Sequence, residues 1–518
     1  MQDTLLDVER PDGVGRIMGE MLRLLPSIFI SRLGWVGMKV TDTALLGHVS
    51  SHALTASALS DLWTSATGVL IQGRVLSIFV GNAIGAGEPK LAGEWLQLTL
   101  LVQACIAAPV MALWGLTTHV LRAFGEHDAS LLDDASYYAL ILSTAIPPRV
   151  IYSALSQFLS AQKLVKSLAF IGLFGLALNL LLGLALVLGV PWADFSGYGF
   201  SACPIVTSSV EWSQAAFLVA WTAAHGLHRT AWPLGGCCGW SMRVVTRARV
   251  FAYLRLYIPA ALSIASDFWR MSLVGAFAAS LSSTDLAVFT TSYRLMWISL
   301  TLAGSLSAAI GVLLAQHLGA GRVATAKRTL HLGIALAVGL LTLIGAGIVL
   351  APRLLASIFS ADDTVQSAMA DARYSLALAT VTMNLAVVAE GTLMSTGRAR
   401  TVLVVGLLGS WAGQVPAVAL LINVWQRSLQ AVYFGVAFGY ALLCVLLFMV
   451  LGTLDWDAVA KEAQQRAQPY CSTQTAEEPE QCIAGSVEPL PPLEPPAPNE
   501  QSAPPSTTKP AAGAPNVD

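Results

Sequence analysis

The sequence predicts an all-α integral membrane protein, with twelve transmembrane helices in two six-helix lobes related by pseudo-two-fold symmetry. Composition, an internal repeat and the number of apolar segments support this fold class. Of the 518 residues, 55% are hydrophobic and only 12% are charged, whereas soluble globular proteins average roughly 25% charged residues. Much of the protein surface is therefore expected to face lipid.

The chain contains an internal repeat. Residues 81–87, Gly-Asn-Ala-Ile-Gly-Ala-Gly, return as residues 315–321, Ala-Gln-His-Leu-Gly-Ala-Gly. Further matches keep nearly the same offset: Pro26 with Pro259, Trp63 with Trp297, and Leu159-Ser160 with Met394-Ser395. Duplicated membrane units are a recurring architecture of secondary transporters, in which the binding site lies between the two units. The repeat therefore directs attention to solute movement and to the space between the halves.

Apolar segments of sufficient length occur in equal numbers in the two copies. A membrane helix needs about 20 mainly apolar residues. The predicted spans are 24–47, 54–81, 94–120, 135–161, 166–190, 199–226, 250–280, 286–315, 327–351, 369–396, 401–424 and 431–453. Six spans fall in each copy, and an even number gives both copies the same orientation, related by an axis along the membrane normal.

The parts between and around the spans complete the predicted organisation. We expect a cytoplasmic N-terminal segment (1–22), an N-lobe (23–226), a cytoplasmic linker (227–249), a C-lobe (250–453) and a cytoplasmic tail (454–518). Lysine and arginine collect in alternate loops, so the positive-inside rule places those loops and both termini in the cytoplasm. No secretory signal is recognisable at the N-terminus. After Asp455 the chain is rich in Pro, Glu, Gln, Ser and Thr, a composition that predicts a disordered tail.

Several classes of function lack support in the sequence. The net charge of −2, without a basic cluster, gives no indication of a nucleic-acid partner. The seven cysteines show no CxxC spacing and the histidines no metal spacing, so we expect no metal site and no cofactor. Glycines 85–87 and 319–321 are interpreted as helix C-caps, because no strand precedes them and no GK[ST] follows. No catalytic constellation is recognisable, and the protein is not expected to be an enzyme.

Charged residues inside apolar spans are the candidates for function. Such residues are costly in a bilayer and usually face the interior of the protein. They are Arg32, Lys39, Asp42, Asp61, Arg74, Arg149, Glu211, Asp267, Arg270, Arg294 and Glu390.

Asp42, near the outer end of the first span, is the strongest of these candidates. Burial disfavours the ionised form of a carboxylate, so an inward-facing Asp42 could accept a proton on one side and release it on the other. The alternative is an ion pair with Lys39, three residues earlier on the same helical face. Asn179 lies among leucines in the fifth span, and its repeat mate is the amide Gln414, which favours an inward position for both.

In the seventh span, Asp267 and Arg270 are three residues apart and flank Phe268 and Trp269. They form either a local ion pair or part of a cation site capped by aromatic rings. If Arg270 and Arg294 both face the interior, the C-lobe carries a net positive charge.

Six segments, in order along the chain, resemble motifs of the multidrug and toxic compound extrusion (MATE) family. They are 42–48 ("VDT..VGH"), 81–87 ("GQAxGAG"), 160–162 ("QAQ"), 197–204 ("G.G..GAP"), 267–269 (the start of "EWW..E" in eukaryotic members) and 393–397 ("L.G.G"). The resemblance covers residues 24–453.

The resemblance implies an antiporter that exports drugs, toxins or secondary metabolites in exchange for H⁺ or Na⁺ by alternating access between two lobes. It places ion coupling on Asp42 and Asn179. Substrate contacts are expected from six residues: Gln162, Asp267, Trp269, Arg270, Arg294 and Glu390. The expected partners are a small organic solute and the bilayer, with a monomeric protein in the plasma membrane or a vacuole-type organelle membrane.

The sequence departs from the family pattern at several acidic positions. Gly183 stands in place of the fifth-helix acid, Ser272 in place of the second Glu of "EWW..E", and Arg294 near the eighth-helix Glu. Glu390 is a candidate replacement for an acid of the tenth helix. Three alternatives therefore stay open: an exporter of organic anions or carboxylates that uses C-lobe arginines, a lipid-precursor flippase of the wider superfamily, and a membrane scaffold or sensor.

Overall fold

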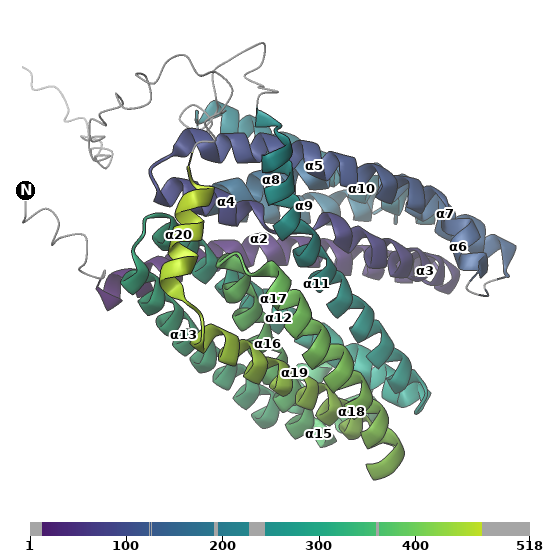
Figure 1. Ribbon diagram of the computed structural model, residues 1–518. Helices are drawn as coiled ribbons and strands as arrows, with labels where there is room; N and C mark the ends of the chain where they lie inside the picture. The colour runs from purple at the N-terminus through teal and green to yellow at the C-terminus, as the bar shows by residue number, and fades with distance from the viewer. Residues whose placement is uncertain are drawn as a thin grey trace, which may run out of the picture. The chain divides into compact units, whose positions relative to one another are not determined.

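The computed structural model describes residues 13–123, 125, 127–190, 195–226, 244–358 and 362–468, and every regular element in these ranges is a helix (Figure 1). The remaining positions lie outside the described residues. They include most of the predicted linker and most of the predicted tail.

The helices of the first half follow the order α2 (Val14–Val49), α3 (Ser51–Gly68), η1 (Val69–Ile71), α4 (Leu76–Gly85), α5 (Pro89–Gly115), α6 (Thr117–Ala123), α7 (Ala129–Ser143), α8 (Ile146–Ala161), α9 (Lys166–Leu186), η2 (Gly199–Ser201) and α10 (Ala202–Ala224). Those of the second half are α11 (Arg247–Ala279), α12 (Ser283–Gly319), α13 (Val323–Leu350), α14 (Pro352–Ser357), α15 (Asp363–Asp371), α16 (Arg373–Ser395), α17 (Ala399–Leu407), η5 (Leu408–Gln414), α18 (Val415–Leu420), η6 (Leu421–Trp425), α19 (Leu429–Gly452) and α20 (Trp456–Arg466).

The described helices confirm the predicted fold class. Nine of them are long and apolar enough to cross a membrane, and α7 with α8 forms a further span that is bent by 44°. The helices α2, with 36 residues, and α10, with 23 residues and many hydroxyl side chains, are also long enough to span a membrane. With them, the described helices match the twelve predicted spans. The predicted boundaries miss two local features. The second span is interrupted at residues 72–75, between η1 and α4, and the eleventh contains the π-helical segments η5 and η6.

The two halves repeat each other at the level of individual caps. Gly87 and Gly321, at the ends of α4 and α12, have φ angles of 81° and 72°. This confirms that they are helix C-caps, because a left-handed residue at this position favours glycine. Lys163 has φ 63° after α8 and Gly397 has φ 87° after α16. The second half therefore uses glycine where the first half holds a lysine in the same unfavourable region.

A pair of aspartates provides a second duplicated cap. Asp128 precedes α7 and accepts hydrogen bonds from the backbone N–H and hydroxyl of Ser130, at 3.0 and 2.7 Å. Asp362 precedes α15 and accepts the same two bonds from Thr364, at 2.8 and 2.7 Å. These bonds favour the ionised carboxylate and hold the pKa of both aspartates below the ordinary value. The repeat thus extends to the loops between spans.

The repeated glycine motifs also bring the halves into contact, which the sequence analysis did not predict. A Cβ atom on Gly85 would lie 2.1 Å from the carbonyl oxygen of Gln316, and one on Gly319 would lie 2.2 Å from that of Asn82. A Cβ atom on Gly81 would lie 2.7 Å from that of Ala315. The backbones of α4 and α12 can approach this closely because small residues recur four positions apart, as in membrane helix pairs of the GxxxG type.

The predicted N-terminal and linker boundaries need correction. The first helix begins at Val14 rather than at residue 24, so residues 14–22 belong to α2 and not to a separate N-terminal segment. The last three residues of the predicted linker, 247–249, belong to α11. Residues 1–12 and 227–243 lie outside the described residues.

The prediction of disorder after Asp455 is wrong for residues 456–466, which form α20. Trp456, Val459, Ala460 and Ala463 recur at helical spacing and pack on Leu314, Leu318, Ala326 and Leu330 of α12 and α13. This apolar stripe stabilises the helix although its other face is polar. The carboxylate of Asp455 caps the helix by accepting the N–H groups of residues 457 and 458 at 3.1 Å.

We expect truncation after Asp455 to destabilise the protein, because it removes α20 from its site on α12 and α13. Deleting a buried tryptophan alone costs about 3–5 kcal/mol, and Trp456 is only 8% exposed. Truncation after Gln468, which retains α20, is the matched control and should melt like the full chain. Thermal unfolding of both proteins in detergent would test this, and equal melting temperatures would show that α20 contributes nothing.

Candidate functional site

The first polar cluster depends on a close crossing of α2 and α9. A Cβ atom on Gly34 would lie 2.4 Å from the carbonyl oxygen of Gly172, so only glycine permits this separation. Two helical turns further along each helix lie Asp42 and Asn179. The close crossing therefore places these two side chains opposite each other in the interior of the first half.

Asp42 is buried, at 3% exposure, and its hydrogen-bond partners are uncharged. One carboxylate oxygen accepts from the Asn179 Nδ2 at 3.1 Å, and the other accepts from the Thr207 hydroxyl at 2.8 Å. The Asn179 carbonyl oxygen is buried without a hydrogen-bond partner. The structure thus brings together the two residues predicted for ion coupling and adds Thr207 of α10.

The alternative partner of Asp42 is engaged elsewhere. The Lys39 ammonium lies 3.0 Å from a carboxylate oxygen of Asp61 on α3, and no ion pair joins it to Asp42. A second, partly buried pair lies nearby, in which Arg149 donates to both oxygens of Glu211 at 2.5 and 2.6 Å. These bidentate bonds satisfy both partners. Of the five charged residues in these groups, Asp42 alone makes no ion pair with a described residue, although Lys39 is near enough to act on it electrostatically.

The second polar cluster lies in the second half around Arg270 of α11. Its guanidinium is fully buried and lies 3.0 Å from the Asp267 carboxylate. It donates to the Tyr440 hydroxyl at 2.8 Å, and its carbon lies 4.7 Å from the centre of the Tyr440 ring. The predicted local ion pair is therefore present, with an aromatic ring of α19 beside it. Because Asp267 compensates Arg270, these two residues give the C-lobe no net positive charge.

Glu390 of α16 belongs to the same cluster. It is close enough to Arg270 and Asp267 to interact with both electrostatically, and its Oε1 atom is buried without a hydrogen-bond partner. The Arg270 Nε and Nη1 atoms are also buried and unpartnered. The cluster therefore contains donors and an acceptor that a bound molecule, an ion or water can satisfy.

The other predicted substrate residues occupy three different places. Trp269 is 43% exposed and donates to the backbone carbonyl of Ala66 at 3.1 Å, which joins the two halves. Gln162 donates to the Phe158 carbonyl of its own helix at 3.2 Å and belongs to neither cluster. Arg294 lies on an exposed face of α12 and, among the described residues, has no ion pair.

Thr207 and Tyr440 are the site residues that the sequence analysis missed. Thr207 is one of many hydroxyl residues in α10, so its position alone does not distinguish it. Tyr440 lies in the most apolar helix of the second half, where a phenol is an unusual residue that could have been noticed. Both side chains are buried. Thr207 contacts Asp42 of α2, and Tyr440 contacts Arg270 of α11.

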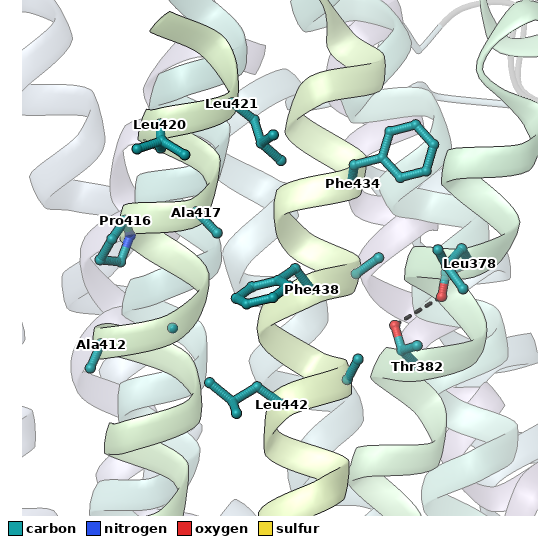
Figure 2. A pocket seen from close by; sticks show the side chains of 13 residues that line it. Leu378, Thr382, Ala412, Pro416, Ala417, Leu420, Leu421, Phe434, Phe438 and Leu442 are labelled. Atoms are coloured by element: carbon teal, nitrogen blue, oxygen red, sulfur yellow. Dashed lines mark hydrogen bonds between the residues drawn. The ribbon is translucent and has the colours of Figure 1, made fainter. Parts of the chain in front are cut away.

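A separate cavity of about 700 Å³ lies between α16, α18 and α19, as Figure 2 shows. Its walls are almost entirely apolar, including Phe434, Phe438 and Leu442. The hydroxyl of Thr382 in this wall donates to Leu378 of the same helix at 2.8 Å. Since binding sites for polar solutes combine apolar walls with convergent polar groups, this cavity has no means of orienting a charged ligand.

Comparison with known proteins agrees with the duplicated architecture. The MatE family model matches the chain twice, at residues 26–184 and 259–419. The chain belongs to the MATE transporter family. The two matched segments correspond to the two halves identified by the internal repeat, and both polar clusters are built around residues inside them.

Relatives and solved structures of this family cover most of the chain. An uncharacterized transporter of Schizosaccharomyces pombe is 24% identical over 86% of this chain and 81% of its own length. Multidrug and toxin extrusion protein 1 of Danio rerio is 23% identical over 86% of this chain and 74% of its own length. The crystal structure of the eukaryotic MATE transporter AtDTX14 has a TM-score of 0.77 at 20% identity, covering 88% of this chain and all of that one. The predicted family and fold are thereby confirmed.

Proposed function

We propose that this MATE transporter is a secondary antiporter that exports organic solutes in exchange for H⁺ or Na⁺. The observation that carries the proposal is the Asp42 cluster, in which a buried carboxylate has only the Asn179 amide and the Thr207 hydroxyl as partners. A buried carboxylate that makes no ion pair is costly in its ionised form. Binding of a cation neutralises it, and that cation provides the coupling.

The chemistry of the cluster suits both candidate ions. A proton on Asp42 turns one carboxyl oxygen into a donor, and the Thr207 hydroxyl can rotate to accept it. Na⁺ prefers oxygen ligands, and the cluster offers the Asp42 carboxylate, the Thr207 hydroxyl and the unpartnered Asn179 carbonyl oxygen. The identity of the ion therefore follows from which gradient drives transport.

Alternating access requires contacts between the two halves that break when the site opens to one side of the membrane and form again when it closes. Most of these contacts join α2, α3, η1 and α4 of the first half to α11 and α12 of the second. They include the hydrogen bond from the Tyr257 hydroxyl to the Leu70 carbonyl at 3.0 Å and the Trp269 bond to Ala66. The internal repeat relates α2 to α11, and α3 with α4 to α12. Because equivalent helices of the two halves face each other, we propose that the solute passes between the two halves.

The role of the second cluster follows from its charges. Asp267 compensates Arg270, and Glu390 adds a further acid. We propose that this cluster contacts the solute and that Arg270 positions Asp267 and Tyr440. The alternative of an organic-anion exporter that depends on Arg270 receives little support from this arrangement.

The expected membrane context follows from the loops. Basic residues in alternate loops support cytoplasmic termini by the positive-inside rule. We propose a monomer in the plasma membrane or a vacuole-type organelle membrane.

The test is an exchange assay with the purified protein in liposomes. Uptake of tetraethylammonium and of citrate is measured first with an acidic interior and then with an outward Na⁺ gradient. A gradient of one pH unit supplies about 1.4 kcal/mol, enough for about tenfold accumulation of a solute exchanged one for one. We expect accumulation of at least one solute under one gradient. Absence of flux for every solute of a wider panel under both gradients would contradict the proposal and favour a scaffold or sensor.

A further inference from the structure

Besides Asp42, two of the candidate charged residues in the spans of the first half make no ion pair in the part of the chain that the structure describes, and both are arginines. Lys39 pairs with Asp61, and Arg149 pairs with Glu211. Arg32 and Arg74 make no hydrogen bond and no ion pair with any described residue. Arg32 is partly buried and Arg74 is exposed. Charged residues inside membrane spans usually face an opposite charge or a water-filled cavity, so both guanidinium groups are accessible to an anion.

The two arginines lie close together. Arg32 is near the middle of α2, and Arg74 belongs to the short interruption between η1 and α4. Their like charges are near enough to repel each other. Repulsion of this kind is relieved when an anion sits between the two cations.

The position of Arg32 is between the two halves of the protein. A Cβ atom on Gly304 of α12 would lie 2.8 Å from the Arg32 Nη1 atom. Next to Arg74, a Cβ atom on Gly73 would lie 2.6 Å from the ring of Tyr257 on α11. Both arginines belong to the first half. Arg32 lies next to α12 of the second half, and the residue before Arg74 lies next to α11.

An aromatic pair accompanies Arg32 along the same helix crossing. Trp35, three residues later on α2, meets Trp297 of α12 edge to face, with ring centres 6.4 Å apart and planes at 61°. Residues three apart lie on the same helical face. Guanidinium groups bind planar anions in bidentate fashion, and tryptophan rings pack against flat apolar bodies.

We infer that Arg32 and Arg74 form a binding site for an anionic group, such as a carboxylate, sulfonate or phosphate, at the junction of the two halves. The group belongs either to an aromatic organic solute in the transport path or to the headgroup of an anionic lipid. The site is distinct from the Asp42 cluster and the Arg270 cluster. The inferred site adds a ligand class to the proposed function. It rests on that function only for the position of the transport path between the two halves.

The test measures binding at equilibrium, in lipid nanodiscs and without an ion gradient, so a failure of coupled transport does not affect it. The solute probes are 4-methylumbelliferyl glucuronide and 4-methylumbelliferyl glucoside, which share a ring and differ by a carboxylate. In phosphatidylcholine nanodiscs we expect the glucuronide to bind about tenfold more tightly, the size expected for charge-assisted hydrogen bonds. The lipid arm measures enrichment of phosphatidylglycerol over phosphatidylcholine in lipid that copurifies with the protein.

Variants assign the effect to the two arginines. Arg32→Gln with Arg74→Gln should abolish the preference, whereas Arg32→Lys with Arg74→Lys keeps the charge and should retain part of it. Arg255→Gln, which removes an exposed charge from α11, is the control and should bind like the unmodified protein. Preference for the glucuronide identifies a solute anion, and enrichment of phosphatidylglycerol identifies a lipid. If neither preference exists, or if one persists in the double glutamine variant with unchanged melting temperature, the inference is wrong.

Discussion

Replacement of Asp42 by asparagine is expected to abolish gradient-driven transport while the protein still folds and inserts. The change keeps the shape of the side chain, so its carbonyl can accept from Asn179 and its amide can donate to the Thr207 hydroxyl. What it removes is the charge that an ion would neutralise. The measurement is solute accumulation in liposomes under the gradient that drives the unmodified protein, which we expect to fall from about tenfold per pH unit to the level of empty liposomes.

Two comparisons separate coupling from a general loss of structure. Asp133→Asn makes the same chemical change at an exposed position of α7 and should leave accumulation unchanged. Exchange of labelled for unlabelled solute without an ion gradient should persist in Asp42→Asn, because it does not require net movement of the ion. Full gradient-driven accumulation in Asp42→Asn would remove Asp42 from the coupling role.

The second large effect is expected at the contact between α4 and α12. Gly85→Ala places a methyl group 2.1 Å from the Gln316 carbonyl oxygen, a distance that real Cβ atoms do not adopt. Since the obstructing atom belongs to the backbone, a side-chain rotation cannot relieve the clash and the helices must separate. Overpacking of this kind typically costs about 1–3 kcal/mol, and we expect a marked fall in melting temperature together with reduced transport.

Gly339→Ala is the matched control for this change. It lies in α13, where a Cβ atom would meet no other atom within 4 Å, and alanine favours a helix more than glycine does. Its melting temperature should be unchanged or slightly higher. Equal melting of Gly85→Ala and the unmodified protein would show that the α4–α12 approach is not required for stability.

The sequence predicts the number and order of the membrane helices because lipid exposure acts on every span in the same way. It also predicts that the side chains of Asp42 and Asn179 are buried in the protein interior, because a charged or amide side chain in an apolar span is costly when it faces lipid. It does not predict partners. Lys39 pairs with Asp61 rather than with Asp42, because helical spacing describes one helix whereas the partner lies on the next.

The missed elements have a common physical cause. The average composition of residues 454–518 is polar, and it does not reveal the short apolar stripe through which α20 packs on α12 and α13. Thr207 is separated from Asp42 by 165 positions, so its role depends on how α10 lies against α2. The glycines of the repeated motif were correctly interpreted as caps, but their second role in the close approach of α4 and α12 requires the position of both helices.

The contacts of the repeated motif are reciprocal: Gly85 meets Gln316, and its counterpart Gly319 meets Asn82, the counterpart of Gln316. Such an arrangement is isologous, as at the interface of a symmetric homodimer. It is what a six-helix ancestor would have possessed if it assembled as a parallel pair before its gene was duplicated and fused. Each ancestral substitution in the motif would then have acted twice at the same interface, while charges such as Asp42 and Arg270 were free to diverge after fusion.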